Sequence, residues 1–320
     1  LGVGAFASCH ELQNIFVDEA NENYTDTDGV VYLSDTTEIF AYPAGRSATS
    51  YTVSEGVTKI GDCAFYGAWN LVNVALPSGL ETVGEFGFYD CRNIQGYELP
   101  ESLTFIERYA FAQNSSLASL YIPDNVIQIS NYAFAYDYRC SSIYLNDTSK
   151  LPRISFAAFA YTGITSVRVP PHVSTIAQYA FEGCPSLRSI TFAANSKLEN
   201  ISAFMFVGAE NLQSIVFENG SALTSVQAHG LEGMRRLTSV DFGDAKLRNI
   251  DNYAFRYCEA LETLAIPETV TNIGRYAFYG DKNLKTLNIP AAVQSIGRFA
   301  FYGAESLNLY FLGDSLPLYL

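Results

Sequence analysis

Residues 261–278 read LETLAIPETVTNIGRYAF, and the spacing of their apolar residues decides the fold. Leu261, Leu264 and Ile266 lie three and then two residues apart, which indicates a short strand whose alternate side chains point inward. Pro267 follows and ends the strand, because proline has no backbone N–H to donate to a ladder. Two more apolar residues at three-residue spacing lead to a closing Ala-Phe pair.

The same pattern recurs along the whole chain. From Phe65 onward, consecutive copies are separated by 22 to 25 residues. A period in this range, present in about twelve copies, indicates a solenoid of stacked coils. Leu231 takes the place of phenylalanine in one copy. The phenylalanines at this position are Phe6, Phe65, Phe88, Phe111, Phe134, Phe159, Phe181, Phe206, Phe255, Phe278 and Phe301.

Each repeat is predicted to depend on its neighbours for a core. A single copy cannot bury its own apolar face, so adjacent coils must cover it. The segment around Ala-Phe is too short for an independent helix and predicts one tight helical turn. The phenylalanine column is expected to stack through the interior. Copies of 24 or 25 residues replace the proline by a polar loop that ends in leucine, as in Ser149-Lys150-Leu151 and Ser196-Lys197-Leu198.

One insertion interrupts the repeats. Phe6 and Phe65 are 59 residues apart, and the extra residues fall at about 18–50. Within them Gly29–Leu33 and Glu38–Pro43 flank a polar turn and predict a β-hairpin. Asp26-Thr27-Asp28-Gly29 has the first ligands of a calcium loop, but its twelfth position is Thr37 and not glutamate. A turn that enters the hairpin explains it better. The whole of residues 1–320 is expected to form a single solenoid domain.

The pattern L-x-x-L-x-I-P-x-x-V-x-x-I-G-x-x-A-F resembles the Treponema pallidum-type, BspA-like class of leucine-rich repeats. The resemblance covers essentially the whole chain, and the insert with Val30-Val31-Tyr32 and Tyr42-Pro43 is similar to one found in that family. It implies a right-handed leucine-rich-repeat solenoid, mostly β with short helical turns. It also implies a surface or secreted protein of host-associated microbes that works in adhesion, with no shared catalytic residues.

Charge excludes several classes of partner. The formal net charge is −14 and the pI is about 4.6; residues 1–100 hold 14 acids against three bases. Nucleic-acid binding needs a basic stripe, and anionic lipid needs basic clusters, so neither partner is expected. No stretch is long and apolar enough to insert into a membrane. The acidic first third is expected to be mainly a solvated face.

The residues of catalysis and metal binding are scattered through the repeats. Cys9, Cys91, Cys184 and Cys258 share one repeat position but never occur in adjacent copies, so no disulfide and no zinc site is expected among them. All six cysteines are interpreted as small buried hydrophobes. The three histidines lie in distant copies, which excludes a nucleophile–histidine pair. We therefore expect no enzyme, no metal and no cofactor.

Two outward-facing positions of each strand remain to carry specificity. The first is nearly constant and small, whereas the second varies from coil to coil. Tyr121, Tyr144 and Arg168 occupy the variable position in consecutive copies and are expected to form one patch, since tyrosine and arginine are enriched at binding hot spots. The full set of candidate ligand-binding residues is Glu98, Tyr121, Tyr144, Arg168 and Thr191.

Three functions fit this pattern. The leading hypothesis is a non-enzymatic adhesion or binding module, extracellular or on the cell surface. It would act as a monomer and recognise a protein, such as a host or matrix protein, through the concave strand face. One alternative is a carbohydrate-binding module whose glycan stacks on the same aromatic residues. The other is a structural spacer in a larger surface protein.

Overall fold

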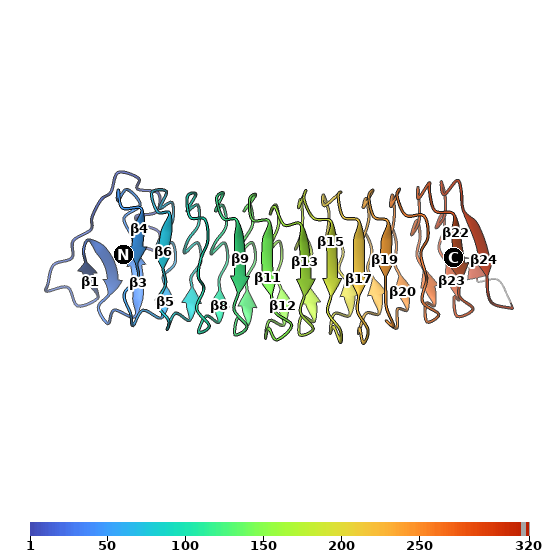
Figure 1. Ribbon diagram of the computed structural model, residues 1–320, viewed down its shortest axis with the longest axis horizontal. Helices are drawn as coiled ribbons and strands as arrows, with labels where there is room; N and C mark the ends of the chain where they lie inside the picture. The colour runs from blue at the N-terminus through green and yellow to red at the C-terminus, as the bar shows by residue number, and fades with distance from the viewer. Residues whose placement is uncertain (315–317, 320) are drawn as a thin grey trace. The chain divides into compact units, whose positions relative to one another are not determined.

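The computed structural model describes residues 1–314 and 318–319. They form two compact units, Leu1–Gly163 (unit 1) and Ile164–Leu320 (unit 2). Within each unit, short strands of successive coils lie side by side in sequence order (Figure 1). The fold is the predicted solenoid, with about 12 coils in all and no helix among the described residues.

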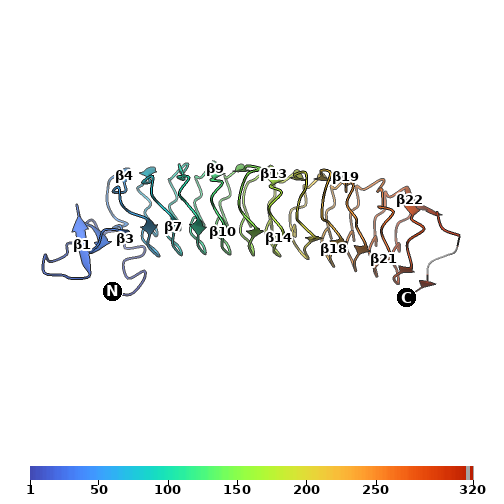
Figure 2. The same cartoon turned by 90° about the horizontal axis from the view of Figure 1, so that it is seen from below.

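Unit 1 contains two ladders of parallel strands on opposite sides of its coils (Figure 2). Side chains in the first, the long-strand ladder, alternate between solvent and the core, as the spacing of apolar residues predicted. Its members are β4 (Ser50–Thr52), β6 (Asn73–Ala75), β9 (Ser119–Ile122) and β11 (Ser142–Leu145). The second, the short-strand ladder, contains β5 (Lys59–Ile60), β7 (Thr82–Val83), β8 (Phe105–Ile106), β10 (Gln128–Ile129) and β12 (Arg153–Ile154).

The predicted hairpin is present in the insert. β2 (Val30–Leu33) pairs antiparallel with β3 (Glu38–Ala41), and β1 (Tyr24–Thr27) adds an outer antiparallel strand. Asp26 accepts hydrogen bonds from the N–H groups of Val17 and Gly29, at 2.8 and 3.3 Å, as a turn residue does. β3 also pairs in parallel with β5, so the insert supplies the first strand of the short-strand ladder.

The first coil is a composite of two distant segments. Phe6 does not enter the phenylalanine column, contrary to prediction; it is half-exposed. Tyr42 of the insert takes that place, stacking on Phe65 with ring centroids 5.0 Å apart and donating its N–H to the carbonyl of Ala64. The β-hairpin thus returns the chain into the column before the regular repeats begin.

Unit 2 has the same two ladders. Its long-strand ladder is regular over four consecutive coils and is interrupted in the quoted stretch, where one bridge from Thr263 to Thr286 replaces the expected strand. Its long strands are β13 (Ser166–Val169), β15 (Ser189–Phe192), β17 (Ser214–Phe217), β19 (Ser239–Asp241), β22 (Thr286–Ile289) and β24 (Asn308–Phe311). Its short strands are β14 (Thr175–Ile176), β16 (Asn200–Ile201), β18 (Ser225–Val226), β20 (Asn249–Ile250), β21 (Asn272–Ile273), β23 (Ser295–Ile296) and β25 (Leu318–Tyr319).

The phenylalanine column forms the core of each unit. In unit 1 the rings of Phe88, Phe111 and Phe134 are fully buried and stack with centroids 5.5 and 5.4 Å apart. The expected helical turn takes the form of consecutive tight turns. Alternate residues donate their N–H groups within the turn or to the next coil. Ala112 donates to the Tyr109 carbonyl in the same turn, whereas Phe111 donates to the Ala133 carbonyl of the next coil. Each coil is thereby tied to its neighbour through the backbone as well as the core.

The two corner variants satisfy the same backbone donor in different ways. At proline corners the proline carbonyl accepts the N–H three residues later, as from Val126 to Pro123 at 3.1 Å. At the longer corners a buried serine hydroxyl accepts it, as from Leu151 to Ser149 Oγ at 3.3 Å. The serine of the polar loop is therefore structural, because a buried N–H without a partner would destabilise the coil.

A buried column that is polar in several coils lies three residues after the phenylalanine. Asn114 Oδ1 accepts the N–H of Cys91, and Asp137 Oδ1 accepts the N–H of Asn114, both at 2.8 Å. In unit 2, Asp281 Oδ1 accepts the N–H of Cys258 at 2.8 Å. Burial raises the pKa of Asp281 to about 8, although the Cys258 N–H opposes that shift.

The cysteines fit the structural interpretation with two exceptions. All six are thiols. Four are buried, as predicted: Cys91, Cys140, Cys184 and Cys258. Cys9 is exposed and Cys63 is only half-buried, because both lie in the composite first turn or beside it. Burial raises the pKa of the Cys140 thiol to about 12, which keeps it protonated and unreactive at neutral pH.

Candidate functional site

A hollow of about 650 Å³ opens on the exposed face of the long-strand ladder of unit 1. Three of the five candidate residues line it, namely Glu98, Tyr121 and Tyr144. It lies over residues 88–110, which we call the Tyr97 coil, between β6 and β9. Its complete lining is Asn73, Val74, Ala75, Leu76, Gly96, Tyr97, Glu98, Ser119, Tyr121 and Tyr144.

The hollow exists because the Tyr97 coil has no long strand. Tyr97 occupies the inward position that holds Val74 and Leu120 in the neighbouring coils, and it is only 6% exposed. Its ring packs against Phe88 and Phe111 with centroids 5.1 and 4.7 Å away. We infer that this larger side chain holds the backbone away from the strand positions on either side.

Gly96 deepens the hollow. It occupies the outward position that carries Asn73 and Ser119 in the neighbouring coils. A Cβ atom placed on it would meet no heavy atom within 4 Å. The space in front of the Tyr97 coil is therefore empty of protein and open to a ligand.

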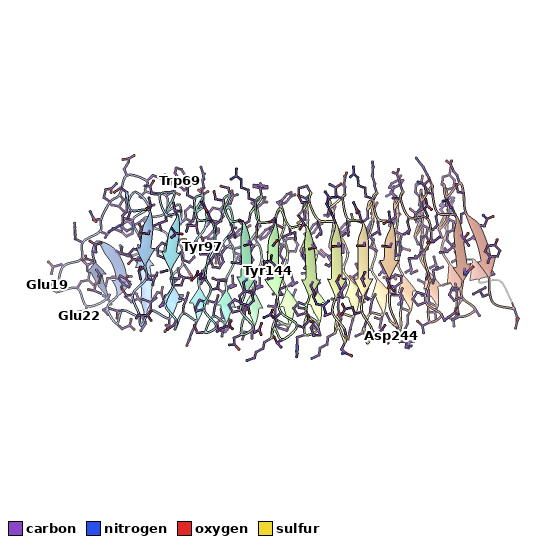
Figure 3. All side chains as sticks on the ribbon, viewed as in Figure 1. Glu19, Glu22, Trp69, Tyr97, Tyr144 and Asp244 are labelled. Atoms are coloured by element: carbon purple, nitrogen blue, oxygen red, sulfur yellow. The ribbon has the colours of Figure 1, made fainter. Side chains whose placement is uncertain are left out.

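Tyr121 and Tyr144 form the aromatic wall. They are direct partners in the register of β9 and β11, and they are 40% and 57% exposed. Figure 3 labels Tyr97 and Tyr144 among the side chains of unit 1. Asn146 Nδ2 donates to the Tyr121 hydroxyl at 2.8 Å and to Asp124 Oδ1 at 3.0 Å, which fixes the ring of Tyr121.

The electrostatics around this wall are acidic. The pKa of the Tyr121 hydroxyl is raised, first by partial burial and then by the carboxylates of Asp124 and Glu101. Glu98 adds an exposed carboxylate on the opposite wall. A ligand with cationic groups beside apolar or aromatic ones matches this lining best.

The remaining two candidate residues lie in unit 2. Arg168 and Thr191 are register partners in β13 and β15. The Arg168 guanidinium binds both carboxylate oxygens of Glu218, at 2.7 and 3.1 Å. This contact is the main cause of the lowered pKa of Glu218, whose Oε2 also accepts the N–H of Ala194. Arg168 is thus already paired with an acid, which the sequence did not predict.

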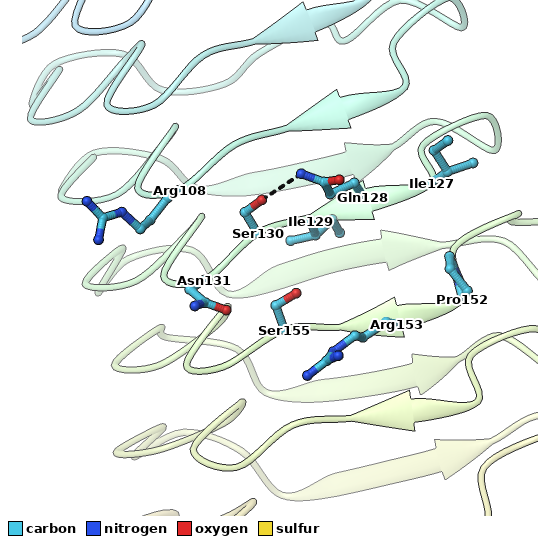
Figure 4. Close-up of a pocket in the computed structure, with 9 residues that line it drawn as sticks. All are labelled: Arg108, Ile127, Gln128, Ile129, Ser130, Asn131, Pro152, Arg153 and Ser155. Atoms are coloured by element: carbon cyan, nitrogen blue, oxygen red, sulfur yellow. Dashed lines mark hydrogen bonds between the residues drawn. The ribbon is translucent and has the colours of Figure 1, made fainter.

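A second hollow of unit 1, about 510 Å³, lies over the short-strand ladder at β10 (Figure 4). Its polar side chains largely satisfy one another. Gln128 Nε2 donates to Ser130 Oγ at 3.0 Å, and both residues also donate to Glu107. Arg108 is held by Glu85. No aromatic side chain lines this hollow, so the long-strand face is the stronger candidate.

Within residues 1–314 and 318–319, no three His, Cys, Asp or Glu side chains gather closely enough to hold a metal ion. No helix of the described chain has the length and apolar character needed to cross a membrane.

The fold and these surfaces define a leucine-rich-repeat protein. The model of the BspA type leucine-rich repeat region matches residues 37–157, 152–244 and 193–309, so the chain belongs to this family. Repeat proteins of this kind are typically non-enzymatic and commonly bind proteins.

Several solved structures are similar to this chain, and the first of them supports the fold. A leucine-rich repeat protein from Bacteroides ovatus is 19% identical with a TM-score of 0.58, over 96% of this chain and 82% of its own. A leucine-rich cell surface protein from Faecalibacterium prausnitzii is 21% identical with a TM-score of 0.44, over 93% and 97% of the two chains. The T. pallidum leucine-rich repeat protein is 21% identical with a TM-score of 0.46, over 70% and 91%. No curated protein matches the sequence.

Proposed function

We propose that this protein is a non-enzymatic binding module, exposed on or secreted from a cell, that recognises a protein through the long-strand face. The observation that carries the proposal is the hollow of about 650 Å³ in front of the Tyr97 coil, with Glu98, Tyr121 and Tyr144 on its walls. Two half-exposed tyrosines beside an empty surface are the residues expected at a binding hot spot.

The lining suggests the character of the partner. Tyrosine rings offer a large contact area with little loss of side-chain entropy. The acids around them, together with the net charge of −11 in residues 1–100 (14 acids and three bases), favour a partner surface rich in lysine and arginine. A host or matrix protein with a basic patch fits this description, and Arg168 and Thr191 are the candidate contact residues of unit 2 taken by itself.

The localisation belongs to the same proposal. The F. prausnitzii relative is described as a cell surface protein, and the family assignment makes the same location reasonable for this chain. A surface location would place the long-strand face where an extracellular protein can reach it.

The experiment is a binding screen with matched variants. Wild-type protein is applied to an array of extracellular matrix proteins and to a glycan array, and each hit is titrated by biolayer interferometry. The double variant Tyr121→Ala with Tyr144→Ala is expected to weaken binding to a protein hit by at least about tenfold. The control Tyr138→Ala removes a tyrosine that is 59% exposed and does not line the hollow; it should bind as wild type does.

Two outcomes would contradict the proposal. If the double variant binds every hit as tightly as wild type, the hollow is not the site. If only glycans bind and the double variant loses them, the same tyrosines serve carbohydrate recognition. A chain that binds nothing on either array would support a spacer role.

A further inference from the structure

A second aromatic hollow, about 470 Å³, lies in unit 2 on the turns that carry the phenylalanine column. It is separate in sequence and in position on the coil from the long-strand ladder. Five aromatic rings and one guanidinium line it, contributed by three successive coils. They are Tyr253, Arg256, Tyr276, Tyr279, Phe299 and Tyr302.

Two rows of rings form the walls. In the first row, Tyr253, Tyr276 and Phe299 stack with centroids 5.1 and 5.3 Å apart. In the second row, Tyr279 and Tyr302 stack at 5.3 Å. The rows meet edge to face, at 67° between Tyr276 and Tyr279 and at 83° between Phe299 and Tyr302. The rings therefore hold one another in place and form a rigid trough along the stacking direction of unit 2.

Arg256 lies in the wall of this trough. Its guanidinium is 4.6 Å from the ring centre of Tyr257 and 5.5 Å from that of Tyr279. Glu232 accepts a hydrogen bond from Nη1 at 2.9 Å, and Nε has no hydrogen-bond partner. That nitrogen is buried, so Arg256 contributes its positive charge to the wall and no free donor.

Two more arginines line the rim. Arg275 and Arg298 occupy the same repeat position in adjacent coils, and each lies over a ring of the first row, at 4.8 Å from Tyr276 and 4.5 Å from Phe299. Both are exposed. Within residues 164–314 and 318–319, neither forms an ion pair with a carboxylate. Like charges on neighbouring coils repel one another, so this pair costs stability unless an anion lies between them.

Unit 1 shows what the same repeat position does without a ligand. There Glu85 and Arg108 occupy it in adjacent coils, and Arg108 Nε donates to Glu85 at 2.8 Å. Opposite charges thus neutralise each other. The protein as a whole carries 33 acids and 19 bases, so two unpaired arginines over an aromatic trough are unusual for its surface.

We propose that this trough binds an anionic oligosaccharide, a chain of hexoses that carry carboxylate or sulfate groups. The C–H faces of the sugars would pack on the rings, as apolar groups pack on aromatic side chains. The tyrosine hydroxyls would hydrogen-bond sugar hydroxyls. Arg275 and Arg298, both exposed, would bind the anionic groups by charge-assisted hydrogen bonds, and the charge of Arg256 would add to the attraction.

An acidic peptide is the weaker candidate for the trough. An extended peptide binds largely through backbone hydrogen bonds, and the backbone donors here are already used. The N–H groups of Tyr276, Tyr279 and Gly280 bond to Arg298, Tyr276 and Tyr302. A sugar ligand needs only the side chains that the trough exposes. This inference does not depend on the strand-face proposal, because it uses other residues.

The test is calorimetric titration with three hexasaccharides. A heparin-derived hexasaccharide carries sulfate groups, and hexagalacturonate carries only carboxylates. Cellohexaose is the neutral probe. At least one anionic probe should bind at least about tenfold more tightly than cellohexaose. Arg275→Gln with Arg298→Gln should weaken that binding at least about tenfold, and so should Tyr302→Ala, since Tyr302 is 60% exposed.

The control variant removes the same number of positive charges from another part of unit 2. Arg188→Gln with Arg236→Gln removes two exposed arginines of unit 2 that do not line the trough, and it should bind as wild type does. Equal losses of affinity in both double variants would show that net charge alone attracts the probe. That result would contradict the proposed site. Failure of both anionic probes to bind, or equal binding of a hexaglutamate peptide, would overturn the ligand assignment.

Discussion

The Tyr97 coil of unit 1 and the ladder β13–β19 of unit 2 are built from the same repeat but present different faces. In unit 2 the position of Tyr97 is held by aliphatic residues such as Val167 and Ile190, and the four strands pair without a break. Its outward groups then satisfy one another, as Arg168 does with Glu218. In unit 1 a buried tyrosine replaces the aliphatic residue, the strand is lost and a hollow opens. A regular coil of this kind therefore closes its own surface, whereas an irregular coil leaves room for a ligand.

The largest effect should come from the phenylalanine column. Phe111→Ala removes a fully buried ring that stacks on Phe88 and Phe134 and also supports Tyr97. We expect a loss of about 3–5 kcal/mol in the free energy of unfolding. Phe206→Ala in unit 2 removes an equally buried ring without such a tyrosine partner and should cost less, by about 0.5–1.5 kcal/mol. Urea unfolding of both variants measures the difference, and an equal or larger cost for Phe206→Ala would contradict it.

A smaller effect should come from the carboxylates of the buried polar column. Asn114 accepts its hydrogen bond as a neutral amide, whereas Asp281 has a pKa raised to about 8. The folded state therefore holds a proton on Asp281 at neutral pH that the unfolded chain releases above about pH 4. Since the unfolded state binds fewer protons in this window, stability falls as the pH rises from about 4 to about 8 and then levels off.

Asp281→Asn should remove the part of this dependence that comes from Asp281, whereas Asp137 of unit 1, whose pKa burial also raises, keeps its own part. The amide keeps an acceptor for the Cys258 N–H and needs no proton, so the variant should be more stable than wild type at pH 8 by on the order of 2 kcal/mol. At pH 5 the difference should be smaller. Thermal unfolding at both pH values provides the measurement. Asp244→Asn, at an exposed acid of the same unit, is the control; an identical pH response in the two variants would refute the account.

The sequence was sufficient for the fold. The recurring spacing of leucine, proline and phenylalanine predicts coils, strands and column, because each repeat must bury the same face against its neighbours. The prediction failed in the first coil, where Tyr42 takes the position in the phenylalanine column that the repeat pattern assigned to Phe6. Nothing in the repeat pattern shows which of two aromatic residues an insertion will bring into the column.

The candidate site was only half predictable. Tyr121 and Tyr144 stand out as variable residues at a constant position, and the register places them side by side. The hollow depends on Gly96 and on the inward Tyr97, which depart from the small polar and aliphatic residues of their columns. That departure was visible in the sequence, but its consequence required knowing that the strand is lost.

The buried polar column was missed for a similar reason. The sequence shows cysteine, asparagine, aspartate and threonine at one repeat position. We interpreted only the cysteines as a buried column. Asn114 and Asp137 accept a backbone N–H of the preceding coil, whereas the Cys91 thiol donates to a backbone carbonyl of that coil. Side-chain hydrogen bonds between coils leave no periodic mark in hydrophobicity.

If the empty space in front of the Tyr97 coil receives a protein partner, a side chain that fills this space should block binding. Gly96→Leu places a side chain in the hollow without a clash and removes no existing contact; Gly79→Leu is the matched control, since a Cβ there also meets nothing within 4 Å. Affinity for a matrix protein captured by wild type should fall at least about tenfold in Gly96→Leu and stay unchanged in Gly79→Leu. Undiminished binding by Gly96→Leu would contradict the account.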